Sequence, residues 1–174
     1  MNSLVNADGR ETVPLVDDLL RSGRLVRLRV TGKSMTPWLE DGVVVTLQRV
    51  PIAALSPGDV VLFRAGNGQP VLHRIIRREQ AGHGTLRFLV KGDACATPDG
   101  FVSGSQIVGK LVGVAREAPC GGRRDVMREL LARRSLDRLL AIASRRSPRL
   151  FHALSLRLVS LWRNSRMRER RAGT

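Results

Sequence analysis

Aromatic residues are scarce in this chain. Phe, Trp and Tyr together make up 3% of its 174 residues, and tyrosine is absent. Proteins that bind single-stranded nucleic acid usually stack the bases on a series of aromatic side chains, and no such series is present here. No base-reading motif is present either. We therefore do not expect nucleic acid to be the partner, and contact with it through arginines ranks below the other possibilities described below.

Cysteine is equally rare. The two cysteines, Cys95 and Cys120, have neither CxxC spacing nor the spacing of a zinc site. We expect no metal and no cofactor. Free thiols in a reducing compartment are the simplest interpretation, with a single disulfide as the alternative.

Long hydrophobic runs are missing as well. The longest stretch without a charged residue is 100–109, whereas a membrane-spanning helix needs about 20 apolar residues. The first residues lack the basic start and apolar centre of a signal peptide. These features predict a cytoplasmic protein, with peripheral association at the inner face of the membrane as an added possibility.

Acidic residues are too few to balance the basic ones, so the net charge is +15. The imbalance is concentrated at one end. Residues 1–122 hold 15 basic and 11 acidic residues, whereas residues 123–174 hold 15 arginines and only 4 acidic residues. A nearly balanced body with a strongly basic tail suggests an anionic partner for the tail.

The pattern of apolar residues predicts a mainly β protein. A short helix from Thr12 to Arg21, with an apolar face of Leu15, Val16, Leu19 and Leu20, comes first. Short β-branched segments separated by glycine-rich turns then predict strands at 24–31, 43–47, 60–63, 71–77, 86–90 and 107–114. We expect a curled antiparallel sheet or barrel. The predicted parts are a helical lead-in (1–23), a β domain (24–118) and a basic, amphipathic helical tail (119–174).

Three short segments carry candidate chemistry. Ser34 follows a glycine at the end of a predicted strand, His73 lies within a strand, and Asp93 and Asp99 lie in one polar loop. A hydroxyl, an imidazole and a carboxylate are the parts of an activated serine nucleophile. Each also has a structural interpretation: a serine in a turn, a hydrogen-bonded core histidine, and aspartates that cap their own turn.

In order and spacing these segments resemble the signal peptidase I superfamily, which includes the self-cleaving repressors of the SOS response. The resemblance covers about residues 24–115 and rests on 32–39, 41–42, 57–61, 73–74, 91–93, Asp99 and 108–110. It implies a serine endopeptidase. His73 stands at the base position, as in the serine–histidine branch of endoplasmic-reticulum and archaeal enzymes. Asp93 and Asp99 are both candidates to support His73.

The resemblance also suggests where substrate binds. Gly32, Lys33 and Met35 are the candidate substrate-binding and oxyanion positions, and Gly32 stands where many relatives have a serine that assists the oxyanion. Backbone N–H groups would then do more of the stabilisation. The expected partner is a polypeptide lying in an apolar groove, with Met35 and Trp38 as possible lining residues.

Two features leave alternatives open. Typical signal peptidases carry a transmembrane helix, and none is predicted here. The tail over 123–171 either packs on the β domain or lies on anionic lipid with Phe151, Leu154, Leu158 and Trp162 inserted. A catalytically silent module of the same fold, working through its basic tail on membrane or nucleic acid, is the alternative to an enzyme.

Overall fold

The computed structural model describes residues 3–6 and 12–115. The predicted basic tail and Cys120 lie outside the described residues. Within these described residues, one helix, α1 (Thr12–Arg21), accompanies eight strands and three short 3₁₀ turns. The strands are β1 (Ser3–Asn6), β2 (Val26–Arg29), β3 (Val44–Gln48), β4 (Val60–Arg64), β5 (Pro70–Gln80), β6 (Leu86–Lys91), β7 (Gly100–Ser103) and β8 (Ile107–Ala115), and the turns are η1 (Ile52–Ala54), η2 (Gly82–Gly84) and η3 (Gly104–Gln106).

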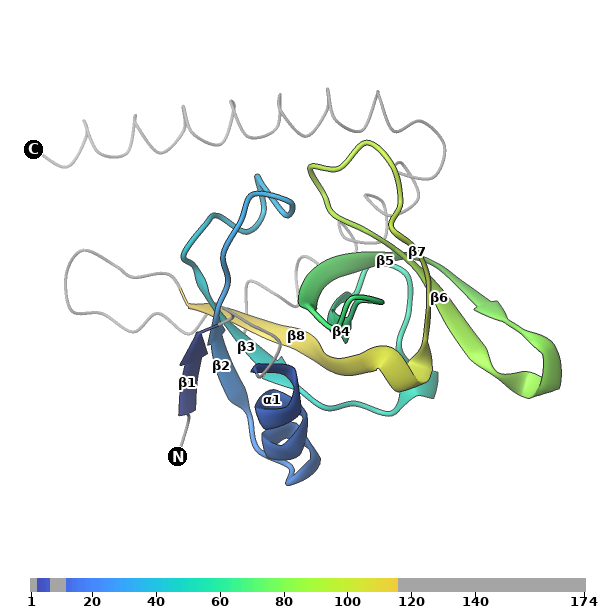
Figure 1. Ribbon diagram of the computed structural model, residues 1–174, viewed down its shortest axis with the longest axis horizontal. Helices are drawn as coiled ribbons and strands as arrows, with labels where there is room; N and C mark the ends of the chain where they lie inside the picture. Colours follow the sequence, from blue (N-terminus) through green and yellow to red (C-terminus); the bar gives the residue numbers. More distant parts are fainter. Residues whose placement is uncertain (1–2, 7–11, 116–174) are drawn as a thin grey trace, which may run out of the picture.

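All eight strands belong to one sheet with the order β1-β2-β3-β8-β4-β5-β6-β7. The seven strands from β2 to β8 pair antiparallel, and β1 joins β2 in parallel at one edge. Irregularities in register interrupt three of the pairings. The sheet is strongly curled (Figure 1). The prediction of a mainly β, curled antiparallel fold with a short N-terminal helix is confirmed.

Two strands were not predicted from the sequence. β1 lies within the first 23 residues, where only a helix was expected, and β7 lies in a stretch that was left without structure. Both are four residues long, and β7 has Val102 as its one buried residue. Strands this short carry too little alternation of apolar and polar residues to be detected.

The core consists of two apolar clusters. The first lies beneath α1 and combines residues of the helix, β2, β3 and β8, including Val16, Leu20, Leu28 and Leu47. The second lies around β4, β5 and β6, with Phe88 at its centre. Gly109 of β8 permits close packing of the helix, because a Cβ atom there would lie 2.7 Å from Leu20 Cδ1.

The buried face of α1 differs from the prediction. Val13, Val16 and Leu20 are buried together with Thr12, whereas Leu15 is 52% exposed. Spacings of three and four residues place Val13, Val16 and Leu20 on one stripe of the helix. Leu15 lies outside this stripe, so its assignment to the core face was wrong.

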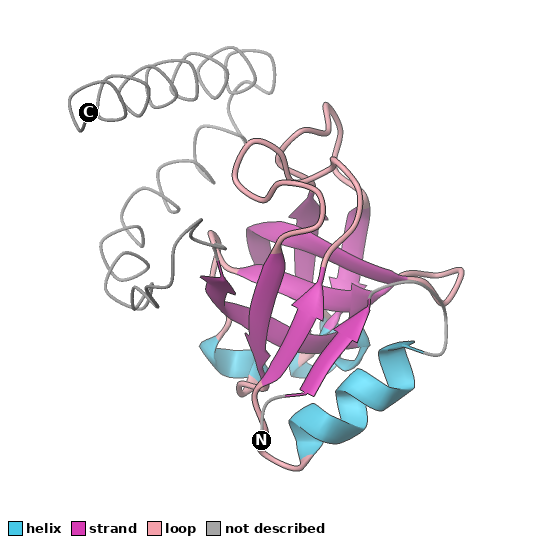
Figure 2. Ribbon diagram, turned by 90° about the vertical axis from the view of Figure 1, so that its left-hand side faces the viewer, coloured by secondary structure: helices cyan, strands magenta, loops and turns pink. Residues whose placement is uncertain are grey.

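The two ends of the sheet carry different features. The loop between β2 and β3 and the loop between β6 and β7 lie together at one end, and α1 lies at the other (Figures 1 and 2). Of the described residues, none forms a helix long and apolar enough to cross a membrane.

Candidate active site

Ser34 lies in a tight turn that follows β2. Gly32 adopts a φ of +97°, which favours glycine, and its N–H donates to Asp41 Oδ1 at 2.8 Å. The Lys33 carbonyl accepts from both the N–H and the hydroxyl of Thr36. The Lys33 carbonyl is thereby used inside the turn.

His73 lies on β5 opposite Val61 of β4 and is only 6% exposed. Its Nε2 is 2.9 Å from Ser34 Oγ, and its Nδ1 contacts Asp99 Oδ2. An ionised carboxylate can only accept, so Nδ1 donates to Asp99 and Nε2 remains to accept from the Ser34 hydroxyl. Ser34 and His73, 39 residues apart in the sequence, meet in the geometry of a nucleophile and its base.

The two aspartates occupy different positions. Asp99 contacts His73 and is anchored by its own N–H, which donates to Val90 O at 3.0 Å. Asp93 is 4% exposed and makes a two-point ion pair with Arg74, at 2.9 and 2.8 Å. Arg74 also donates to Gly58 O at 2.8 Å. Of the two candidates, Asp99 therefore contacts the histidine, whereas Asp93 pairs with Arg74, which also binds the turn before β4.

The β6–β7 loop (residues 92–99) packs directly on the Ser34–His73 pair. Ala94 N–H donates to Ser34 O at 2.8 Å. A Cβ atom added at Gly92 would lie 2.8 Å from Ser34 O and 2.9 Å from His73 Nε2. Gly92 belongs to the 91–93 segment on which the family resemblance rests, but nothing in the sequence indicates that its lack of a side chain makes room for the Ser34–His73 pair.

Lys91 holds the same loop from within. Its side chain is buried, and Nζ donates to Cys95 O at 2.7 Å and to Gly92 O at 3.4 Å. Burial lowers the pKa of Lys91, and the nearby Asp93, Cys95 and Asp99 oppose that shift. Burial also raises the pKa of the Cys95 thiol, which keeps it protonated.

The predicted oxyanion residues differ in whether their backbone N–H groups already donate a hydrogen bond within the protein. The Gly32 N–H is already bound by Asp41. Within the described part of the chain, the N–H groups of Lys33, Ser34 and Met35 donate to no recorded acceptor. The Met35 side chain is 5% exposed and packs in the first core cluster, so it does not line a groove. Its backbone alone is available to a ligand.

Two further sequence expectations concern Trp38, as a residue lining the site, and metal binding. Trp38 is half-buried, and its Nε1 has no hydrogen-bond partner among the described residues. In the same part of the chain, no group of three or more His, Cys, Asp or Glu side chains is arranged to hold a metal ion.

The curled sheet and the juxtaposed serine, histidine and carboxylate define the class of a serine peptidase domain. The chain belongs to the Peptidase S24-like family, whose model matches residues 1–88, half of the sequence. The matched segment contains Ser34 and His73 and ends before Asp93 and Asp99. Comparison with curated proteins gave no match.

Proposed function

We propose that this protein is a serine endopeptidase in which Ser34 is the nucleophile and His73 the general base. The observation that carries the proposal is the chain of contacts from Ser34 Oγ to His73 Nε2, at 2.9 Å, and from His73 Nδ1 to Asp99. A serine hydroxyl attacks a carbonyl only when a base takes its proton. His73 is in reach of that proton.

The proposed reaction has two halves. Ser34 Oγ attacks the peptide carbonyl as its proton passes to His73 Nε2, and Asp99 stabilises the resulting imidazolium. The oxyanion is stabilised by backbone N–H groups of the turn, with Ser34 and Met35 as candidates. His73 then protonates the leaving amine. Water hydrolyses the acyl-enzyme by the same steps, and Ser34 regains its proton.

We also propose that the chain uses the serine–histidine chemistry of the signal peptidase-like branch. Lys91, the buried lysine nearest the site, binds Cys95 O and Gly92 O and so helps to hold the loop. An imidazole occupies the base position instead. By resemblance, the substrate is an extended polypeptide with small residues before the cleaved bond, and it pairs with exposed strand backbone near Ser34.

Substitution of the three residues tests the proposal. With a peptide library as substrate, Ser34→Ala and His73→Ala should each lower kcat/KM by about 10⁴-fold or more. Asp99→Asn should cause a loss of about 10²- to 10⁴-fold, because it removes the group that orients the imidazole. Ser105→Ala, at an exposed serine outside the site, is the matched control. Equal turnover by Ser34→Ala and the control would mean that the dyad is misassigned, whereas no turnover by the control itself would favour the catalytically silent binding module.

A further inference from the structure

A cavity lies beside the C-terminal end of α1, between the helix end and the segment that follows β3. Its volume is about 360 Å³, within the range of about 300–1,000 Å³ common for small-molecule sites. It is lined by Leu20, Arg21, Gly23, Arg24, Gln48, Arg49, Val50 and Pro51. Nothing in the peptidase chemistry uses this cavity.

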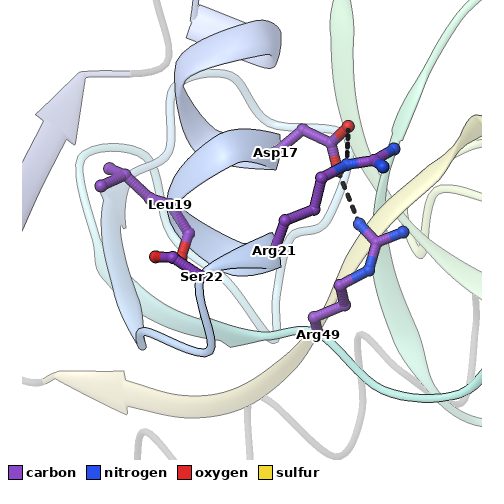
Figure 3. Close-up of polar contacts among 5 residues, drawn as sticks. All are labelled: Asp17, Leu19, Arg21, Ser22 and Arg49. Carbon is purple, nitrogen blue, oxygen red and sulfur yellow. Dashed lines mark hydrogen bonds and ion pairs between the residues drawn. The ribbon is translucent and has the colours of Figure 1, made fainter.

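Three arginines line the cavity, two of them at the end of α1 and in the turn after it and one in the segment after β3, and a single carboxylate partly neutralises them. Asp17 accepts from Arg21 Nε at 2.9 Å and from Arg49 Nη1 at 2.6 Å, so one carboxylate binds both guanidinium groups (Figure 3). Arg24 has no ion-pair partner among the described residues. Since each guanidinium has five N–H donors, most donors around the cavity remain available.

The end of α1 does not oppose an anion as strongly as a bare helix end would. Carbonyl groups at a helix C-terminus carry partial negative charge. Here Leu19 O accepts from Ser22 Oγ at 2.7 Å, as Figure 3 shows, and from Arg24 N–H at 3.3 Å. Leu20 O accepts from Gly23 N–H at 3.1 Å. These bonds satisfy two of the carbonyls in the last turn, which leaves the arginine side chains as the dominant charges.

We propose that this cavity binds the phosphoryl group of an anionic ligand. Guanidinium groups match phosphate oxygens with two parallel hydrogen bonds, and a surplus of two positive charges suits a phosphate better than a neutral ligand. Leu20, Val50 and Pro51 offer apolar contact to the atoms that carry the phosphoryl group. The ligand is a phosphate ester, either free in solution or as the headgroup of an anionic lipid.

The decisive measurement is the affinity of the full-length protein for glycerol phosphate, determined by titration calorimetry. Arg24→Gln and Arg49→Gln should each weaken binding by about three- to ten-fold, as expected for loss of one exposed charge-assisted contact. Asp17→Asn should tighten binding by a similar factor, because it removes the internal anion that competes for Arg21 and Arg49. Arg87→Gln is the control, since it removes the same charge from an exposed ion pair on β6.

The same variants are then sedimented with vesicles of phosphatidylglycerol in phosphatidylcholine. Loss of glycerol phosphate binding with unchanged vesicle binding identifies a soluble ester, and loss of both identifies a site that also accepts lipid headgroups. Loss of vesicle binding alone identifies a headgroup site. The proposal is overturned if Arg24→Gln and Arg49→Gln behave as Arg87→Gln in both assays, or if Asp17→Asn weakens binding.

Discussion

Gly92 lies where any side chain would collide with the Ser34–His73 pair. A Cβ atom at this position would lie 2.7 Å from Cys95 Sγ, 2.8 Å from Ser34 O and 2.9 Å from His73 Nε2. The sulfur can move, but the Ser34 carbonyl is backbone and accepts from Ala94 N–H. A substitution must therefore displace either the loop or the pair.

We expect Gly92→Ala to lower kcat/KM by about a hundred-fold, since a displacement of about 1 Å at reacting groups has an effect of that size. Gly66→Ala is the matched control, because a Cβ atom there meets nothing within 4 Å. Circular dichroism and steady-state kinetics of both variants are the measurements. A folded Gly92→Ala variant with the activity of the Gly66→Ala control would show that the close packing is unimportant.

The sequence was sufficient to select Ser34 and His73 as the candidate nucleophile and base. It could not decide between Asp93 and Asp99, because both lie in one polar loop whose path has no periodic pattern. The two aspartates differ in their partners, because Asp93 forms a buried ion pair with Arg74 and Asp99 contacts His73. Asp41 was likewise visible in the sequence, but its bond to the Gly32 N–H depends on how the β2–β3 loop closes.

At the level of elements, β5, the β6–β7 loop and the turn before β4 are joined by Arg74. It donates to Asp93 and to Gly58 O, and both side chains of the ion pair are at most 5% exposed. Removing one partner of a buried pair leaves the other charge without compensation, which typically costs about 3–5 kcal/mol. The loop that packs on Ser34 therefore depends on this pair for its position.

We expect Asp93→Asn to lower the free energy of unfolding by about 3 kcal/mol. This is the low end of the range for breaking a buried pair, because the amide can keep part of the hydrogen bonding. Glu79→Gln is the control, since Glu79 pairs with the more exposed Arg77 and Arg87 and should change stability by no more than about 1 kcal/mol. Urea denaturation of both variants provides the comparison. Similar losses of unfolding free energy in the two variants would mean that the buried pair stabilises the fold no more than an exposed one.

Most elements were predictable because their apolar pattern is local. α1 begins and ends where its sequence indicates, and β2, β3, β4, β5, β6 and β8 lie where short segments rich in Val, Ile, Leu and Phe predict strands. The pairing order was not predictable, because β8 is inserted between β3 and β4 by contacts distant in sequence. The exposure of Leu15 has the same origin, since the sheet beneath α1 selects which stripe of the helix is covered.

At the scale of the whole molecule, charge is unevenly distributed. Of the net charge of +15, residues 123–174 contribute +11. Each basic residue near an anionic membrane contributes about 1 kcal/mol of attraction at low salt, and added salt screens it. We propose that residues 123–171 hold the protein on anionic lipid, with Leu154, Leu158 and Trp162 providing the apolar contact.

A truncation after Gly122 should lose most of its sedimentation with phosphatidylglycerol vesicles, and the full-length protein should lose it progressively with added salt. A second, full-length variant with Leu154, Leu158 and Trp162 changed to Ser keeps every charge and tests the apolar contact by itself. We expect it to bind more weakly than the wild type and to become more sensitive to salt, because only the screened attraction remains. If the truncated and full-length proteins sediment equally, the tail is not the membrane contact. Any residual vesicle binding by the truncation that Arg24→Gln removes would then be assigned to the cavity beside α1.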